Sequence, residues 1–594
     1  MSGFAAVHVS FDGTAPGAVR PGTPWLAEVA PPPGLWIGTA GLTSTASAAG
    51  WRLWAAGEVF AYRGAPEAPL ARLAADLARG NADAAALRMH AVVLAWEEGP
   101  RRLHVLTDRF ATVHAYAGGR PGQRSVGTCF ASTAAGSARR LDPVALTGFC
   151  GFGFYPGDRT PWDDVVVLRP ATWTTFDDQG TVSASRRTWD WWYDPTPDRS
   201  DDDLVDDFHE RWTRAVRSHV GSRTAVVPLS GGLDSRTVYA AFPAATGPDH
   251  VRPMTYGYGA SSVEVRIGRA VARARGREAA AFDVPRYLFD RIGEVTAAVE
   301  GFQALTFSRQ AGVADELAAL GDVIVGGHWG DVWFDPAGAG AAATPAALAA
   351  KAHATFAKRG RAWLLDHVCA PRLGGADPEG VLRDLVHDEL ARLPDIGDAD
   401  LQLKALKTEQ WSFRWTLASI RAYRLARPTL MPFYDPDVTD FFLRIPPDRL
   451  TGRRLQVAYL RRHHPDLARV RWQQTGRPLA PRPWDPPAAL IRRAAAKAWR
   501  TARRRPVVER NWEVQFLTGD GPARLRAHLL ADHPLLPAAT PALVEGFLAR
   551  PDPIGAHAID ALLTLATLDL QGPEGGSRRG SGARLPADGT GRDR

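Results

Sequence analysis

The chain has 594 residues, of which 45% are hydrophobic and 23% charged, and its formal net charge is +7. That length exceeds one ordinary core, so two or three domains are expected, and the composition excludes a disordered or fibrous protein. No apolar run of about 18 residues occurs, which argues against a transmembrane helix. No basic region followed by an apolar stretch opens the chain, so no signal peptide is expected.

The cysteines and the basic residues narrow the class of protein further. Cys129, Cys150 and Cys369 form no CxxC pair and cannot all pair with one another. This argues against a disulfide scaffold or a structural zinc site and predicts a cytoplasmic protein. The densest basic run, Arg492–Arg505, interleaves arginines with a tryptophan, as some nucleic-acid sites do. A solvated helix face is the favoured interpretation, so nucleic acid is not an expected partner.

Residues 1–195 are expected to be rich in β-strands. Short apolar runs such as Ala91–Trp96 and Leu103–Leu106 are separated by glycine, proline and charged turns. The stretch Asp194–Asp203 contains prolines and five aspartates, which predicts a linker that leads into a helix.

After this linker the pattern changes to alternating helices and strands. The expected elements are a helix over Leu204–Val220, a strand over Ala225–Leu229, a helix from about Ser235, a strand over Val251–Tyr256 and a helix over Ser262–Arg275. Such alternation predicts a parallel sheet with helices on both faces, within a domain of residues 200–480. Residues 481–570 are expected to form a helical basic extension, and residues 571–594 a disordered tail.

The strongest chemical signal is Ala225–Ser235, an apolar strand that runs into Ser-Gly-Gly-Leu-Asp-Ser and then a helix. Two glycines let the backbone approach a ligand closely, and the N-terminus of the helix offers N–H groups to an anion. Ser230 and Ser235 add hydroxyl donors, and Asp234 can hold a magnesium ion that bridges phosphate oxygens. A plain glycine turn is the alternative, but these offsets favour nucleotide binding. No GxxxxGK[ST] sequence occurs, so this is not a usual P-loop.

This segment resembles the nucleotide site of the asparagine synthetase family. Three further segments extend the resemblance in the family's order: Met254–Gly257, Val325–Asp331 and Pro432–Phe442 with the following Arg444–Pro447. The resemblance implies a doubly wound parallel-sheet ATP-pyrophosphatase domain of the α/β class, with ATP and Mg²⁺ as cofactors.

The resemblance also implies the residues of the site. Asp234 and Asp331 would be metal ligands and catalytic residues, although an N-cap or a surface acid is the alternative role for Asp331. The ATP-binding residues would be Leu229, Ser230, Gly231, Gly232, Asp234, Ser235, Tyr256, Gly326 and Gly327. His328 replaces the family's usual acid, and a substrate contact and a structural role are equally open for it.

Residues 1–195 resemble, more weakly, the N-terminal-nucleophile (Ntn) glutaminase domain of the same family, an αββα fold. The matching segments are Ala56–Arg63, Asp108–Tyr116, Leu168–Ala171 and Arg187–Trp189. That chemistry needs a cysteine at position 2, where this chain has Ser2. Ala56 stands where the family has an asparagine that stabilises the oxyanion. The domain is therefore interpreted as a degenerate glutaminase that is kept as a scaffold, and catalysis by Ser2 is the weaker alternative.

The segments expected around the acceptor depart from the family. Pro428–Met431 lacks the acid and the arginine that often precede Pro-Phe, and Arg471–Pro478 lacks the family's lysine. Arg471 and Arg477 are the only cations that this part of the sequence offers, and Arg477 is taken as a catalytic candidate. The nucleotide half of the site is therefore expected to be intact and the acceptor half rebuilt.

The resemblance implies an ATP-dependent ligase that adenylates a carboxylate, releases pyrophosphate and transfers the acyl group to ammonia or an amine. The carboxylate would belong to a small molecule, a glycan or a peptide, and the product would not be free asparagine. The alternatives are an ammonia-dependent asparagine synthetase, an intramolecular cyclase of the lasso-peptide or β-lactam type, and a nucleotide-binding scaffold without activity. No membrane partner is expected, and a homodimer is left open.

Overall fold

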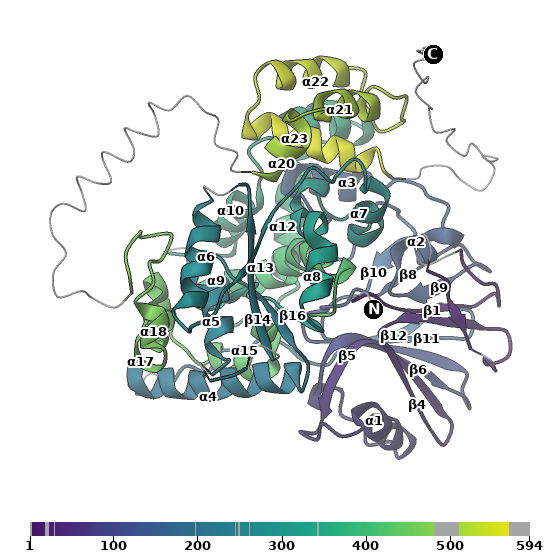
Figure 1. Cartoon of the computed structure of the whole chain (residues 1–594). Helices are drawn as coiled ribbons and strands as arrows, with labels where there is room; N and C mark the ends of the chain where they lie inside the picture. The colour runs from purple at the N-terminus through teal and green to yellow at the C-terminus, as the bar shows by residue number, and fades with distance from the viewer. Residues whose placement is uncertain are drawn as a thin grey trace, which may run out of the picture.

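Apolar runs between turns at the start of the chain, and alternating helices and strands after them, produce a mixed α/β structure. In the computed structural model, two antiparallel sheets are followed by a parallel five-stranded sheet and many helices (Figure 1). The structure describes residues 3–17, 23–28, 30–196, 198–243, 245–247, 250–259, 262–340, 344–479 and 510–568. The basic run and the tail expected at 571–594 lie outside these residues.

The region expected to be rich in strands forms two six-stranded antiparallel sheets. The first has the order β10-β8-β9-β1-β3-β2, with β1 Ala5–Ser10, β2 Leu26–Ala27, β3 Trp36–Gly41, β8 Tyr116–Gly118, β9 Ser125–Gly127 and β10 Val165–Val167. The second has the order β12-β11-β7-β6-β5-β4, with β4 Thr43–Ala48, β5 Trp51–Tyr62, β6 Leu87–Glu97, β7 Arg102–Thr107, β11 Thr172–Phe176 and β12 Val182–Arg187. The strands predicted over 91–96 and 103–106 lie within β6 and β7 and are confirmed.

The two antiparallel sheets pack against each other through alternate apolar side chains. Val9 and Ile37 from the first sheet share a buried cluster with Val92 and Leu94 from the second. The next residues along the second sheet point to its other face, where helix α1 (Pro69–Ala78) covers them. Two sheets with a covering helix agree with part of the expected αββα layering.

The parallel sheet has the order β15-β14-β13-β16-β17. Its strands are β13 Ala225–Pro228, β14 Val251–Gly257, β15 Ala280–Asp283, β16 Val323–Val325 and β17 Thr429–Leu430. Strand β13 lies between β14 and β16, with Val226 opposite both Arg252 and Ile324. Successive residues 225–227 point to opposite faces of the sheet and all are fully buried, so both faces are covered. The strand order reverses between β13 and β16, the usual place for a ligand in open α/β sheets.

Helices surround this sheet and make up most of the remaining chain. The main helices are α2 Phe130–Thr133, α3 Pro143–Phe152, α4 Asp201–Val220, α5 Leu233–Ala240, α6 Val263–Arg273, α7 Ile292–Val299, α8 Ala314–Leu320, α9 Gly330–Trp333, α10 Pro345–Phe356, α11 Arg361–Leu364, α12 Pro378–Ala391, α13 Ala399–Lys407, α14 Leu417–Ile420, α15 Pro436–Phe442, α16 Pro447–Leu450, α17 Arg454–His463, α18 Pro465–Ala468, α20 Asn511–Leu517, α21 Gly521–Leu529, α22 Thr540–Ala549 and α23 Pro553–Leu565. The helices predicted over 204–220 and 262–275 are confirmed as α4 and α6. No helix within the described ranges is both long enough and apolar enough to cross a membrane.

The C-terminal helices are packed into the main core of the protein. Phe516, Leu525 and Ile559, from α20, α21 and α23, belong to the same buried cluster as Val226 and Ile324 in the parallel sheet. The part of the expected extension that the structure describes is helical, as predicted. These C-terminal helices share one core with residues 200–480, because their apolar faces pack against that domain as well as against each other.

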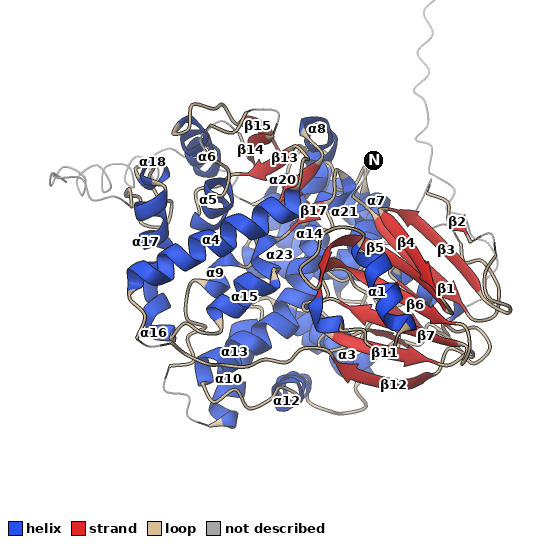
Figure 2. Cartoon of the chain, turned by 90° about the horizontal axis from the view of Figure 1, so that it is seen from below, coloured by secondary structure: helices blue, strands red, loops and turns tan. Residues whose placement is uncertain are grey.

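Charged contacts fix the antiparallel sheets to the helical part of the molecule, which Figure 2 displays side by side. Nη2 of Arg88, on β6, donates to Oδ2 of Asp435 at 2.5 Å, and Nε2 of the buried His219 lies 2.9 Å from the same oxygen. Arg169 donates two bonds of 2.8 Å to the carboxylate of Glu389. Such buried, paired charges favour one fixed arrangement of the two parts over others.

Candidate functional site

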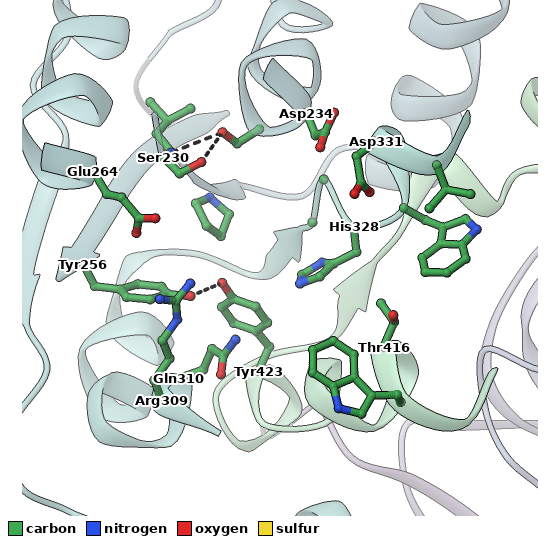
Figure 3. Close-up of a pocket in the computed structure, with 18 of the residues that line it drawn as sticks. Ser230, Asp234, Tyr256, Glu264, Arg309, Gln310, His328, Asp331, Thr416 and Tyr423 are labelled. Atoms are coloured by element: carbon green, nitrogen blue, oxygen red, sulfur yellow. Dashed lines mark hydrogen bonds between the residues drawn. The ribbon is translucent and has the colours of Figure 1, made fainter. Parts of the chain in front are cut away.

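A cavity of about 450 Å³ lies beyond the C-terminal ends of β13 and β16, where the strand order reverses (Figure 3). The predicted site residues that line it are Leu229, Ser230, Asp234, Ser235, Tyr256, Gly326, Gly327 and Asp331. These residues come from three strand ends that are distant in sequence, and the fold brings them to one place. Gly231, Gly232 and Arg477 are not among its lining residues.

The loop after β13 is closed by its two serines. The backbone N–H of Ser230 donates to Oγ of Ser235 at 3.2 Å, and the two hydroxyl oxygens are 3.1 Å apart. The N–H of Gly232 donates to Oγ of Ser230 at 3.2 Å, and α5 begins at the next residue. Asp234 therefore lies in the first turn of a helix, beside N–H groups that have no partner within the helix.

Gly327, in the loop after β16, and Gly330, the first residue of α9, allow this segment to contact the start of α5 directly. A Cβ atom on Gly327 would lie 2.9 Å from the backbone nitrogen of Ser235 and from the carbonyl carbon of Asp234. A Cβ atom on Gly330 would lie 2.9 Å from Cγ of Asp234. Only glycine permits these approaches without a shift of the backbone, so the two loops are held against each other at Asp234.

Asp234 is a buried carboxyl group with a raised pKa. Burial and the neighbouring charge of Asp331 raise its pKa to about 6, although the charge of Arg453 opposes this shift. Nη1 of Arg453 lies 3.2 Å from Oδ1 of Asp234, and Nε2 of Gln456 donates to the same oxygen at 3.0 Å. Asp331 is exposed, in the first turn of α9. A cation between the two carboxylates would relieve their repulsion.

The donor set fits magnesium better than a self-contained metal centre. Within the described ranges, no group of three or more His, Cys, Asp or Glu side chains could hold a metal ion. Magnesium is usually held by one or two carboxylates together with the phosphates of its nucleotide, and Asp234 and Asp331 offer that number.

Trp329 occupies a strained position beside the two carboxylates. Its φ angle is 75°, in the left-handed region that a bulky residue rarely adopts, and its Nε1 donates to Oγ1 of Thr408 at 3.2 Å. Thr408 begins a π-helix, Thr408–Thr416, from which Trp411 and Trp415 line the cavity. Residues in the left-handed region and π-helical turns both destabilise a fold. They are found most often at functional sites, where the function needs their geometry.

The opposite wall is aromatic and carries two opposite charges, those of Arg309 and Glu264. The hydroxyls of Tyr256 and Tyr423 are 2.8 Å apart, and the guanidinium of Arg309 lies 5.1 Å from the centre of the Tyr256 ring. Burial, together with the charge of Arg309, lowers the pKa of His328 to about 4, so its imidazole is neutral near pH 7. Flat aromatic and guanidinium surfaces of this kind suit a nucleobase.

Sequence reasoning missed the cations of the site. Lys407, at the end of α13, lines the cavity and has no carboxylate within ion-pair distance in the described part of the chain. Burial lowers its pKa, and the nearby charge of Asp331 partly opposes this. Arg309 and Arg453 also reach the site. None of the three lies near a recognisable motif, so their positions depend on packing and no local signal predicts them.

The loop that holds Arg477 contacts the loop after β13 through Gln473. The N–H of Gln473 donates to the carbonyl of Gly231 at 3.0 Å, and a Cβ on Gly231 would lie 2.1 Å from Oε1 of Gln473. Gly231 is therefore required for packing against this loop. Arg477 itself is exposed and does not line the cavity, so its predicted catalytic role has no support from its position.

Ala56, one of the two positions expected to mark a degenerate glutaminase, does not line this cavity. Ala56 is fully buried in β5, opposite Thr43 and Val92, and its methyl group offers no donor. Ser2 lies outside the described residues. The N–H of the following Gly3 donates to the carbonyl of Arg424 at 2.9 Å, so the start of the described chain packs on the segment before β17.

Comparison with known proteins adds no relative: no protein-family model matches the chain, and a search of curated proteins finds no match.

Proposed function

We propose that this protein is an ATP-dependent ligase that joins a carboxylate to ammonia or an amine through an acyl-adenylate. The observation that carries the proposal is the meeting of two loops at the point of strand-order reversal, which brings Asp234 and Asp331 to one cavity beside Ser230 and Ser235. The resemblance to the asparagine synthetase family supports the same assignment, with residues 200–480 as an ATP-pyrophosphatase domain and residues 1–195 as a degenerate Ntn domain.

In this proposal the chain's own residues bind and orient the nucleotide. The base lies against Tyr256, and the phosphates lie at the start of α5 with the hydroxyls of Ser230 and Ser235 and the ammonium of Lys407. Asp234 and Asp331 hold Mg²⁺, which neutralises phosphate charge when it is bound.

The reaction then needs two displacements. An oxygen of the substrate carboxylate attacks the α-phosphorus of ATP, the bond to the β-phosphate oxygen breaks, and pyrophosphate leaves. The nitrogen of the amine next attacks the acyl carbon, the bond to the AMP oxygen breaks, and the amine loses a proton. Correct placement of the reacting groups contributes most of the acceleration.

The nitrogen comes from outside the chain in this proposal, because Ala56 cannot stabilise an oxyanion. An ammonia-dependent asparagine synthetase and an intramolecular cyclase use the same nucleotide chemistry and differ in the acceptor. Growth of an asparagine auxotroph that expresses the protein, without added asparagine, would indicate the first of these. A scaffold without activity would bind ATP but form no AMP.

Carboxylate-dependent exchange of labelled pyrophosphate into ATP tests the proposal. A panel of carboxylic acids should include at least one that supports exchange in the wild type. Asp234→Ala and Asp331→Ala should each abolish exchange and leave the circular dichroism spectrum unchanged. Asp315→Ala, which removes a carboxylate that is 91% exposed on α8, is the matched control and should retain full activity. Exchange that persists in the double variant D234A/D331A would refute the site.

A further inference from the structure

A second cavity of about 550 Å³ adjoins the nucleotide cavity. The two share Arg309, Gln310, His328 and Trp415 as lining residues, so these side chains form a common wall. The far side of the second cavity is built by the C-terminal helices α20 and α23. A compartment next to the nucleotide, closed by helices that lie beyond the parallel-sheet domain, has the position of a substrate site.

The surface of this second cavity is suited to a large apolar group. Phe307 is 43% exposed, which is unusual for a large hydrophobic side chain, and its ring meets that of Trp415 edge to face at 5.1 Å. Trp512 from α20 and Ala556 from α23 add to the apolar lining. The C-terminal part of the chain also contributes polar groups there, namely Arg510, Asn511, His557 and Asp560. An aromatic or aliphatic body that covered Phe307 would remove this exposed surface from water.

The common wall carries polar atoms that lack partners. Oε1 of Gln310, Nδ1 of His328 and Nε1 of Trp415 are buried and make no hydrogen bond within the described ranges. Gln310 is only 5% exposed. The Arg309 guanidinium lies over the Tyr256 ring and interacts with Tyr258 and with the charge of Glu264. Buried polar atoms without partners are costly, so a ligand that supplied partners at this wall would be favoured.

We propose that the second cavity binds the body of the carboxylate substrate, which is an amphipathic acid with a large aromatic or aliphatic group. Its carboxylate lies at the shared lining, where Arg309 supplies the positive charge and the indole N–H of Trp415 a donor, on the side that opens to the nucleotide cavity. Its apolar body lies on Phe307 and Trp512. This inference rests on the proposed function and names its acyl substrate. Aspartate has no body of this kind, so the compartment also favours a larger substrate than aspartate.

Binding titrations of the full-length protein with phenylpropionate, indolepropionate and decanoate, in the presence of magnesium and a non-hydrolysable ATP analogue, test the inference. At least one of these acids should bind, and acetate should bind much more weakly. Ala556→Trp fills the cavity and should weaken that binding by about tenfold or more. Ile554→Trp, on the same helix but 55% exposed and outside the lining, is the control and should bind as the wild type does.

Phe307→Ala provides a second variant that removes an exposed ring and does not crowd the core. It should weaken binding of the aromatic acids by about tenfold and leave the affinity for the ATP analogue unchanged. Failure of all three acids to bind, unchanged affinity in both variants, or tighter binding of phenylpropylamine than of phenylpropionate would overturn the inference. Failure of the wild-type protein to bind the ATP analogue would instead refute the proposed function. The two negative results can therefore be distinguished.

Discussion

Nη1 of Arg453 lies 3.2 Å from Oδ1 of Asp234, and this contact joins the residue before α17 to the first turn of α5. The charge of Arg453 lowers the pKa of the carboxyl, but burial outweighs it and the pKa rises to about 6. Asp234 is thus poised between its neutral and ionised forms at a pH where ordinary aspartates are fully ionised. A metal ion beside Asp234 would favour the ionised form.

The affinity for magnesium-bound ATP should depend on the ionisation of Asp234. Because only the carboxylate holds the cation, affinity should be full above a pH of about 6 and should fall as the pH decreases through that value. Titration calorimetry across this range measures the effect. Asp234→Asn should lower the affinity and remove the part of the pH dependence that is due to Asp234. The pH dependence that remains in the variant is due to ionisation of the ATP phosphates. Identical pH profiles for the two proteins would contradict the assignment.

Lys407 should contribute to binding of the phosphates and not of the base. Lys407→Met removes the positive charge at this wall of the cavity, so the affinity for ATP should fall by roughly tenfold while the affinity for adenosine stays constant. Competition titrations with both ligands distinguish these effects. Lys351→Met removes an exposed lysine from α10 and should change neither affinity. Equal losses for ATP and adenosine would indicate a structural role for Lys407.

Gly327 should tolerate no side chain. In Gly327→Ala the new Cβ would lie 2.9 Å from the backbone of Asp234 and Ser235, so one loop must move. The free energy of unfolding should fall by about 1–3 kcal/mol, and ATP binding should weaken as well. Gly546→Ala, at an open position within α22, should instead raise stability by about 0.5–1 kcal/mol. Denaturant unfolding of both variants provides the measurement, and wild-type stability and binding in Gly327→Ala would contradict the close contact.

The contact of Arg88 with Asp435 should be important for stability. Arg88→Met removes the guanidinium from the buried carboxylate and leaves the His219 ring beside it, so unfolding should become easier by about 3 kcal/mol. The Arg88 and His219 partners lower the pKa of Asp435, so its contribution is present at neutral pH and is lost as the pH falls below the usual aspartate range. Arg273→Met breaks an exposed pair with Glu278 and should cost less than about 1 kcal/mol. Equal effects of the two substitutions would contradict this role.

The protein should not hydrolyse glutamine. Ala56 offers no donor to an oxyanion, and the chain has Ser2 at the position where the glutaminase domain that it resembles uses a cysteine. Release of glutamate, measured with the purified protein, should equal the rate in buffer alone. Hydrolysis that is present in the wild type and disappears in Ser2→Ala would show that the N-terminal region retains the activity.

The sequence by itself determined the elements and motifs whose signals are local. The strands β13 and β14, the helices α4 and α6 and the loop at Ser230–Ser235 were all predictable, because periodicity, caps and glycines act over a few residues. The mixed α/β class followed from the alternation of these elements. Gly327 and Asp331 were found through their motif, and the structure brings both to the cavity beside Asp234.

Only the tertiary structure showed which charged side chains and which other lining residues surround the cavity. Lys407, Arg309 and Arg453 reach the site from helices and loops that carry no motif, because packing between elements distant in sequence sets their positions. The same holds for the second cavity, which Trp512 of α20 and Phe307 line together although they are distant in sequence. Local patterns predict which face of a helix is apolar, but not which partner will cover it. The elements of the proposed nucleotide site could therefore be predicted from the sequence, whereas the cavity beside it could not.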